Sequence, residues 1–139
     1  MADKATSRDV ETTLTTTEVV NRFIDAFRKK DPAAIPDLVA DDCVMEAIQP
    51  APNGERVEGY DANVRFWRAL VADPLGSFEI EDVEVCGDRA INRWRYRFGE
   101  GDASSVRGVT LIKVRGSKIV EALAYAKTTG QTDLGQNRG

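Results

Sequence analysis

The 139-residue sequence contains no histidine, the commonest general base and metal ligand of proteins. Catalytic pairs of Ser with His or of Cys with His are therefore excluded. Its two cysteines, Cys43 and Cys86, lie far apart without the spacing of a metal site. We expect both to be small, buried, reduced residues. We expect no metal and no cofactor.

A basic surplus and long apolar runs are also missing. The formal net charge is −4, whereas a nucleic-acid-binding domain usually carries excess Lys and Arg to neutralise phosphates. No run of about 18 or more apolar residues occurs, so we expect no membrane-spanning helix. Residues 1–13 lack the apolar segment of a signal peptide. We therefore expect a cytoplasmic protein that binds neither nucleic acid nor membrane.

Two helices and a shorter one are predicted in the first half of the chain. Thr15 and Glu18 have the spacing of a capping box, and an apolar stripe follows at helical intervals. Asp31 and Pro32 suit the cap and first residue of a short helix over 32–39. A third helix is predicted over 60–73. Residues 1–14 are expected to form a disordered lead-in, 15–128 one domain, and 129–139 a tail.

Strand patterns dominate the second half. A short strand is predicted over 43–48, followed by a loop rich in Pro and Gly. Four strands are predicted over 77–86, 89–99, 106–115 and 118–127, joined by the turns "CGDR" and "RGSK". Three helices and a mostly antiparallel sheet predict an α+β fold, with the helices covering one face.

The stretch "NRWRYRF" (92–98) alternates arginines with aromatic residues. Basic residues interleaved with aromatics suit a nucleic-acid-binding strand, but the acidic net charge argues against that reading. Because neighbouring side chains of a strand point to opposite faces, Trp94 and Tyr96 share one face and Arg93, Arg95 and Arg97 share the other. We expect the aromatic face inside and the arginines outside, neutralised by acids of neighbouring strands or by a second subunit.

Four segments resemble the nuclear transport factor 2-like superfamily, which includes ketosteroid isomerases and SnoaL-like polyketide cyclases. They are "EVVNRFIDAFRKKDPAAIPDLVADDCVMEA", "VEGYDANVRFWRAL", "DRAINRWRYRFG" and "RGVTLIKVRGSKIVEALAYAK", within residues 18–127. The resemblance implies a cone: a strongly curved sheet wrapped around the three helices, with a cavity inside. It also implies a small apolar, steroid- or polyketide-like ligand and a homodimer.

Strand parity within this cone predicts the cavity wall. Small alanines on the last strand leave room for a flat ligand, unless Trp67 and Trp94 simply pack into that space. The expected wall residues are Phe23, Met45, Ala47, Trp67, Trp94, Phe98, Thr110, Ile112, Ala122, Ala124 and Ala126.

The resemblance places the three catalytic groups of ketosteroid isomerases at Phe23, Ala47 and Thr110, where this chain has none of them. Lys127 stands where SnoaL-like cyclases often carry an acid. Asn92 and Tyr96 remain as candidate catalytic residues, because two hydrogen-bond donors could polarise one ligand carbonyl.

Three functions stay open at this point. The chain could be an isomerase, cyclase or hydrolase with an unusual polar set, as a carboxylate or Lys127 inside the cavity would indicate. It could be a non-catalytic ligand-binding or accessory protein, as a cavity with only Asn92, Tyr96 and Thr110 would indicate. A filled cavity would favour an interaction module that uses the outer sheet face.

Overall fold

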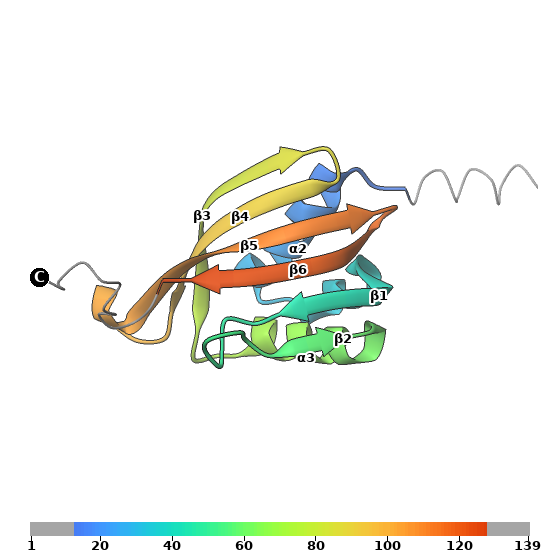
Figure 1. Cartoon of the computed structure of the whole chain (residues 1–139). Coiled ribbons are helices and arrows are strands. Elements are labelled where there is room, and N and C mark those ends of the chain that lie inside the picture. The colour runs from blue at the N-terminus through green and yellow to red at the C-terminus, as the bar shows by residue number, and fades with distance from the viewer. Residues whose placement is uncertain (1–12, 128–139) are drawn as a thin grey trace, which may run out of the picture.

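The computed structural model describes residues 13–127, which form an α+β fold with helices on one side of a curved sheet (Figure 1). The fold class predicted from the sequence is confirmed. The helices are α2 (Thr16–Lys29), the 3₁₀ helix η1 (Pro32–Leu38), α3 (Tyr60–Ala72) and the short 3₁₀ helix η2 (Asp102–Ser104). The strands are β1 (Val39–Glu46), β2 (Arg56–Glu58), β3 (Ser77–Cys86), β4 (Arg89–Arg97), β5 (Ser105–Arg115) and β6 (Lys118–Ala126).

Helix α2 begins as its sequence predicts. The Thr15 hydroxyl accepts from the Glu18 backbone N–H at 3.1 Å, and the Glu18 carboxylate accepts from the Thr15 N–H at 2.9 Å. The predicted capping box is therefore confirmed. Lys30 ends the helix in the left-handed region, at φ 50°. Asp31 then caps η1 by accepting from the Ala33 N–H at 3.1 Å.

The six strands lie in the order β2-β1-β6-β5-β4-β3. All neighbouring pairs are antiparallel except β1 and β6, which run parallel. Strand β1 starts at Val39, four residues before the predicted start at Cys43, and continues directly from η1. The short edge strand β2 lies in the segment predicted as loop, where three residues are too few to show a periodic pattern.

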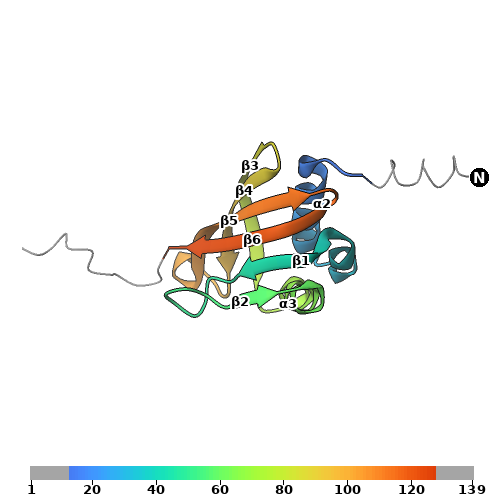
Figure 2. The same cartoon turned by 45° about the vertical axis from the view of Figure 1, so that its right-hand side comes forward.

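Irregular pairing accompanies the curvature of the sheet. The register between β3 and β4 shifts between Ile80 and Asp82, and that between β5 and β6 shifts between Lys113 and Val114. Such bulges bend and twist strands. Helices α2 and α3 lie on the same side of the curved sheet (Figure 2). One continuous apolar cluster packs between these layers, with Val19, Ile35, Cys43 and Ala122 fully buried.

Arg93, Arg95 and Arg97 of β4 face outward, and two of them pair with acids of β3. Arg93 lies 3.2 Å from Asp82, and Arg97 bonds Glu79, both on β3. On β5, Arg107 contacts Glu81 of β3 at 2.7 Å. Arg95 donates to the Ser105 hydroxyl at 2.7 Å. Acids of β3 thus pair with Arg93, Arg97 and Arg107, neighbours of the kind that the sequence predicted.

Other expectations from the sequence meet different outcomes. Cys43 is buried, but Cys86 is exposed, because it ends β3 beside the turn at Gly87. Most of the expected lead-in and all of the expected tail lie outside the described residues. Leu14, assigned to the lead-in, packs against the core, and its N–H donates to the Ser117 hydroxyl at 2.7 Å. No helix within residues 13–127 is long and apolar enough to cross a membrane.

Candidate functional site

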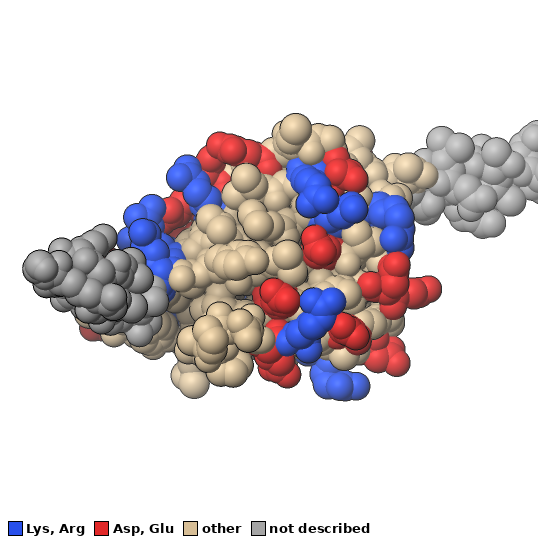
Figure 3. Space-filling model, viewed as in Figure 1, with Lys and Arg blue, Asp and Glu red and all other residues tan. Residues whose placement is uncertain are grey.

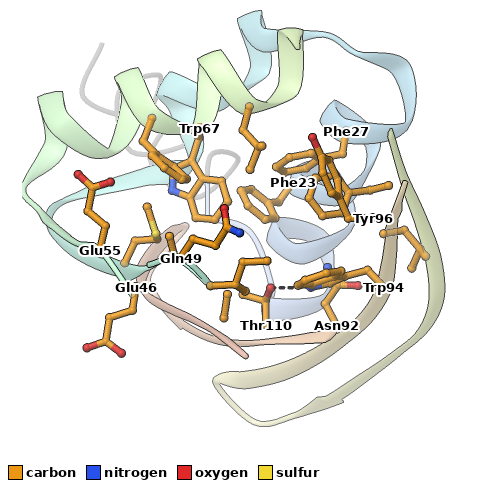
Figure 4. A pocket seen from close by; sticks show the side chains of 18 residues that line it. Phe23, Phe27, Glu46, Gln49, Glu55, Trp67, Asn92, Trp94, Tyr96 and Thr110 are labelled. Carbon is orange, nitrogen blue, oxygen red and sulfur yellow. Dashed lines mark hydrogen bonds between the residues drawn. The ribbon is translucent and has the colours of Figure 1, made fainter. Parts of the chain in front are cut away.

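A cavity of about 350 Å³ lies between the helices and the inner face of the sheet (Figure 4). Most of its wall is apolar, and seven of its side chains are aromatic. The residues that line it are Phe23, Phe27, Met45, Glu46, Ala47, Ile48, Gln49, Glu55, Phe66, Trp67, Leu70, Phe78, Ile80, Asn92, Trp94, Tyr96, Thr110 and Ala124.

The aromatic rings of the wall form a connected belt. Phe23 of α2 meets Trp67 of α3 edge-on, with the ring centres 4.9 Å apart. Phe27 of α2 meets Phe78 of β3 at 5.1 Å, and Phe78 meets Trp94 of β4 at 5.3 Å. Edge-to-face contacts of this kind stabilise aromatic clusters. The belt joins both helices to the sheet and holds the wall in place around the empty space.

The sheet side of the cavity, which we call the floor, carries its buried polar groups. Asn92 of β4 and Thr110 of β5 are paired across the two strands, with 5% and 6% of their surface exposed. The indole Nε1 of Trp94 donates to the Thr110 hydroxyl oxygen at 2.9 Å (Figure 4). The Oδ1 of Asn92 is enclosed and accepts no hydrogen bond from the described residues.

Tyr96 lies on the same face of β4, but its hydroxyl group points away from Asn92 and toward the α3 side of the cavity (Figure 4). There it packs on Gly76, where an added Cβ would lie 1.9 Å from the phenol oxygen. Burial, with a smaller contribution from Asp73, raises the pKa of the phenol, which therefore stays protonated at neutral pH. The structure does not bring Asn92 and Tyr96 together around one ligand carbonyl.

Acidic and polar side chains stand at the mouth, next to the loop between β1 and β2. The carboxylates of Glu46 and Glu55 both point away from the cavity (Figure 4). Glu46 is bound to Arg56 at 3.2 Å, and the same arginine bonds Glu58 at 2.7 Å. No Lys or Arg belongs to the described cavity wall.

The wall contains most of the residues that the sequence placed there, from the helices as well as the strands. These are Phe23, Met45, Ala47, Trp67, Asn92, Trp94, Tyr96, Thr110 and Ala124.

Four expected wall residues lie elsewhere. Phe98 is 50% exposed, because β4 ends at Arg97 and the chain turns away from the helices. Ile112 and Ala122 face inward but are paired in the filled core beyond the cavity. Ala126 borders a groove on the outer face. Among the three alanines of β6, only Ala124 opens onto the cavity.

Sequence reasoning missed several apolar wall residues, although the pattern contained signals for them. Phe27 belongs to the apolar stripe of α2. Phe78 and Ile80 alternate with exposed residues along β3, so the parity argument used for β4 would have found both. Phe66 and Leu70 extend the inner face of α3 on either side of Trp67.

The described cavity wall does not bring together the carboxylates that a proton-transfer enzyme of the nuclear transport factor 2-like superfamily would use. Phe23, Ala47 and Thr110 all line the cavity and bring no carboxylate into it. Lys127 lies beside the outer-face groove with Arg107 and Tyr125, not in the cavity. Within residues 13–127, no cluster of three His, Cys, Asp or Glu side chains could hold a metal ion.

A curved sheet closed by helices around an aromatic cavity defines a cone-shaped α+β protein of the nuclear transport factor 2-like type. The model of the SnoaL-like domain family matches residues 20–122. The chain therefore belongs to the SnoaL-like domain family.

Solved structures agree with this family. A nuclear transport factor 2-like protein of unknown function from Mesorhizobium loti is 46% identical, with a TM-score of 0.77. That match covers 81% of this chain and 91% of the other. The fold is also similar to a putative ketosteroid isomerase from Kribbella flavida, which is 17% identical with a TM-score of 0.69 over 91% of this chain and 89% of that one.

A putative polyketide cyclase from Sinorhizobium meliloti is 24% identical, with a TM-score of 0.62 over 80% of this chain and 99% of that one. Both low-identity likenesses concern the fold alone. A comparison with curated proteins finds no match.

Proposed function

We propose that this SnoaL-like protein binds a small, flat, largely apolar molecule in the cavity, without acid–base catalysis of the ketosteroid isomerase type. The observation that carries the proposal is an unfilled, aromatic-lined space of about 350 Å³ in a domain that is otherwise closely packed. Natural cores are filled to high density. An apolar cavity of this size with few polar groups is typical of a ligand site.

Titration with fluorene, a flat hydrocarbon, tests this proposal. Binding is measured by calorimetry and by the fluorescence of Trp67 and Trp94, which both line the cavity. We expect saturable binding to the wild type and a change in tryptophan emission. Failure of fluorene and of larger polycyclic probes to bind would overturn the proposal.

Ala124→Trp should abolish uptake in calorimetry while the fold survives, because added volume enters an empty space and not a packed core. Ala103→Trp is the matched control, since Ala103 is exposed in η2 and outside the wall. Global unfolding of the Ala124 variant would mean that this alanine is packed and that the cavity is not available.

An isomerase or cyclase activity is the second candidate. Two fold relatives carry such names, and Glu55 stands at the mouth as a carboxylate that a ligand could approach. A general base must lie within hydrogen-bond reach of the proton it removes, and the Glu55 carboxylate points away from the cavity (Figure 4). We expect no isomerisation of a Δ5-3-ketosteroid at a rate comparable with that of a true ketosteroid isomerase.

We further propose that the protein forms a homodimer through the outer face of the sheet. Ile91, Leu111 and Leu123 lie side by side on β4, β5 and β6, and Val109 pairs with Tyr125 next to them. These five residues form what we call the outer patch. Ile91, Leu111 and Tyr125 are 40%, 38% and 54% exposed. Uncharged surface covers the middle of this face, with charged groups beside it (Figure 3).

A second copy fits the outer patch better than nucleic acid does. Arg93, Arg97 and Arg107 beside it are already paired with acids of β3, which leaves this face less free positive charge for phosphates. A twofold dimer would set one apolar patch against another and leave the charged pairs at the rim.

A further inference from the structure

The polar groups of the cavity floor have hydrogen-bonding capacity that the described residues leave unused. The Thr110 hydroxyl accepts from Trp94 Nε1 at 2.9 Å, but its own hydrogen meets no acceptor in residues 13–127. The Asn92 side chain makes no hydrogen bond within the same range. Polar groups buried to this degree nearly always have a partner. Both residues are more than nine-tenths buried and both line the cavity, so a ligand there can supply the partner that the Thr110 O–H and the Asn92 Nδ2 lack.

These unused groups are mainly donors. The Oδ1 of Asn92 is fully enclosed, whereas its Nδ2 keeps accessible surface, and the space that Asn92 borders is the cavity. Thr110 has one oxygen lone pair occupied by Trp94 and one O–H left to donate. Asn92 and Thr110 are directly opposite each other on β4 and β5. Their Cβ atoms are therefore about 5 Å apart, close enough for both donors to reach one acceptor.

Trp94 determines how Thr110 is presented. Its indole is 4% exposed and lies over Gly108, where an added Cβ would meet the ring at 2.6 Å. The bond from Nε1 fixes the Thr110 rotamer and uses the oxygen as an acceptor. A hydroxyl that accepts one hydrogen bond becomes a stronger donor in the next. Trp94 is thus a positioning residue for the Thr110 donor.

The charges around the cavity favour an uncharged ligand. The described wall has no Lys or Arg, and its acids, Glu46 and Glu55, stand at the mouth. A ligand carboxylate inside would lose its hydration without gaining a cationic partner, which weakens its binding. A neutral oxygen acceptor has no such cost.

We propose that the cavity selects a flat, uncharged molecule with a carbonyl group on its edge, whose oxygen accepts from Asn92 Nδ2 and Thr110 Oγ1. This inference rests on the proposed ligand-binding function and adds the chemical class of the ligand. The two donors replace the pair formed by Asn92 and Tyr96 that the sequence suggested.

Three probes of one shape separate this inference from the proposed function. Fluorene has no polar group, fluorenone carries a carbonyl, and fluorene carboxylate is an anion. We expect wild-type protein to bind fluorenone about thirtyfold more tightly than fluorene, since each of the two hydrogen bonds adds about fivefold in affinity. We expect the carboxylate to bind more weakly than fluorene. If fluorene binds and fluorenone is no tighter, the inference fails while the proposed function stands.

Two variants test whether Asn92 and Thr110 cause the tighter binding of fluorenone over fluorene. Asn92→Leu and Thr110→Val should each remove about fivefold of the fluorenone affinity and leave fluorene affinity unchanged. Thr110→Ser keeps the hydroxyl and should restore the preference, which also controls for damage to the fold. The carbonyl stretching band of bound fluorenone should shift to lower frequency in the wild type and shift less in Asn92→Leu and Thr110→Val.

Fluorenol reports which way the Asn92 amide faces. An alcohol that binds more tightly than the ketone would mean that the floor offers an acceptor, and it would overturn the inference. An unshifted carbonyl band in the wild type would do the same.

Discussion

Two buried asparagines, Asn92 and Asn63, differ in how their side-chain amides are used. Asn92 makes no side-chain hydrogen bond with the described residues and borders the cavity, whereas Asn63, whose Oδ1 also accepts no hydrogen bond from them, uses its Nδ2 to join three segments. The Nδ2 of Asn63 donates to the carbonyl oxygens of Cys43, Val57 and Gly59 at 2.8–3.1 Å. The side chain is fully buried. It therefore ties the start of α3 to β1 and β2.

Asn63→Asp should destabilise the fold by roughly 3 kcal/mol, because an acceptor would replace the donor that faces these carbonyls and their bonds would be lost. Urea unfolding measures the change. Asn53→Asp is the control, since Asn53 is exposed, and it should change the free energy of unfolding by less than about 0.5 kcal/mol. Equal stability of the two variants would show that the Asn63 bonds contribute little.

The two thiols should differ sharply in reactivity. Burial, aided by Asp42 and Glu121, raises the pKa of the Cys43 thiol to about 12, whereas Cys86 is exposed. Only a thiolate reacts with an aromatic disulfide reagent. At pH 8 we expect the native protein to react rapidly at Cys86 alone, and at Cys43 only after denaturation. Cys86→Ser should leave no rapidly reacting thiol; two equally fast thiols in the native protein would contradict the burial of Cys43.

The same thiol links stability to alkaline pH. The pKa of the Cys43 thiol rises from its ordinary value of 9.0 to about 12 in the fold. The folded state therefore holds the proton more tightly than the unfolded chain does. This contribution to stability is complete below pH 9 and is lost as pH rises toward 12. The free energy of unfolding, measured with urea, should be lower at pH 10 than at pH 8. This difference should be smaller in Cys43→Ala.

At the scale of elements, patterns that repeat along a segment were predictable and local irregularities were not. The capping box of α2 and the alternation along β4 gave the right helix start and the right inner face. Strand β2 was missed, because its three residues form a strand only through pairing with β1. Phe98 was misplaced, because parity predicts a face but not where β4 ends.

The floor shows the same limit. Parity placed Asn92 and Thr110 on the inner face, but it did not reveal that they stand opposite each other. That fact depends on the register between β4 and β5, which the turns and packing determine. The direction of the Tyr96 hydroxyl depends on Gly76, a loop residue distant in the sequence.

Lys30, at the end of α2, holds a loop that is distant from it in the sequence. Its Nζ donates to the carbonyl oxygens of Asp73 and Gly76 at 2.7 and 2.6 Å, which ties the end of α2 to the loop between α3 and β3. Gly76 in turn supports the Tyr96 ring, so this bond holds one end of the cavity wall.

Lys30→Met should lower the free energy of unfolding by roughly 1–2 kcal/mol, since two charged hydrogen bonds are lost and one of them is exposed. Methionine keeps a Cβ, so the cost of the left-handed backbone stays the same. Lys29→Met, one residue earlier and exposed, is the matched control in thermal or urea unfolding. A control that loses as much stability would mean that helix charge, and not the loop contact, is responsible.

At the scale of the whole molecule, the two faces of one sheet serve different purposes. The inner face borders a neutral cavity, and the outer face combines the outer patch with paired charges. Because successive side chains alternate, the stretch "NRWRYRF" contributes to both: Asn92, Trp94 and Tyr96 to the cavity, and the arginines to the rim of the outer patch. A change on one face can therefore be made without altering the other.

The homodimer proposal is tested on the outer face alone. We expect wild-type protein to sediment as a dimer at micromolar concentration and Leu111→Glu to sediment as a monomer, because the variant would bury a charge against an apolar patch. Leu75→Glu is the matched control: Leu75 is 81% exposed in the loop between α3 and β3, so this variant should remain a dimer.

Arg95→Glu should also favour the monomer, by placing an unpaired acid at the rim. A monomeric wild type, or a Leu111→Glu variant that stays dimeric, would refute the interface. Retention of nucleic acid at about 0.15 M salt that Arg95→Glu abolishes would instead make the arginines a binding strand.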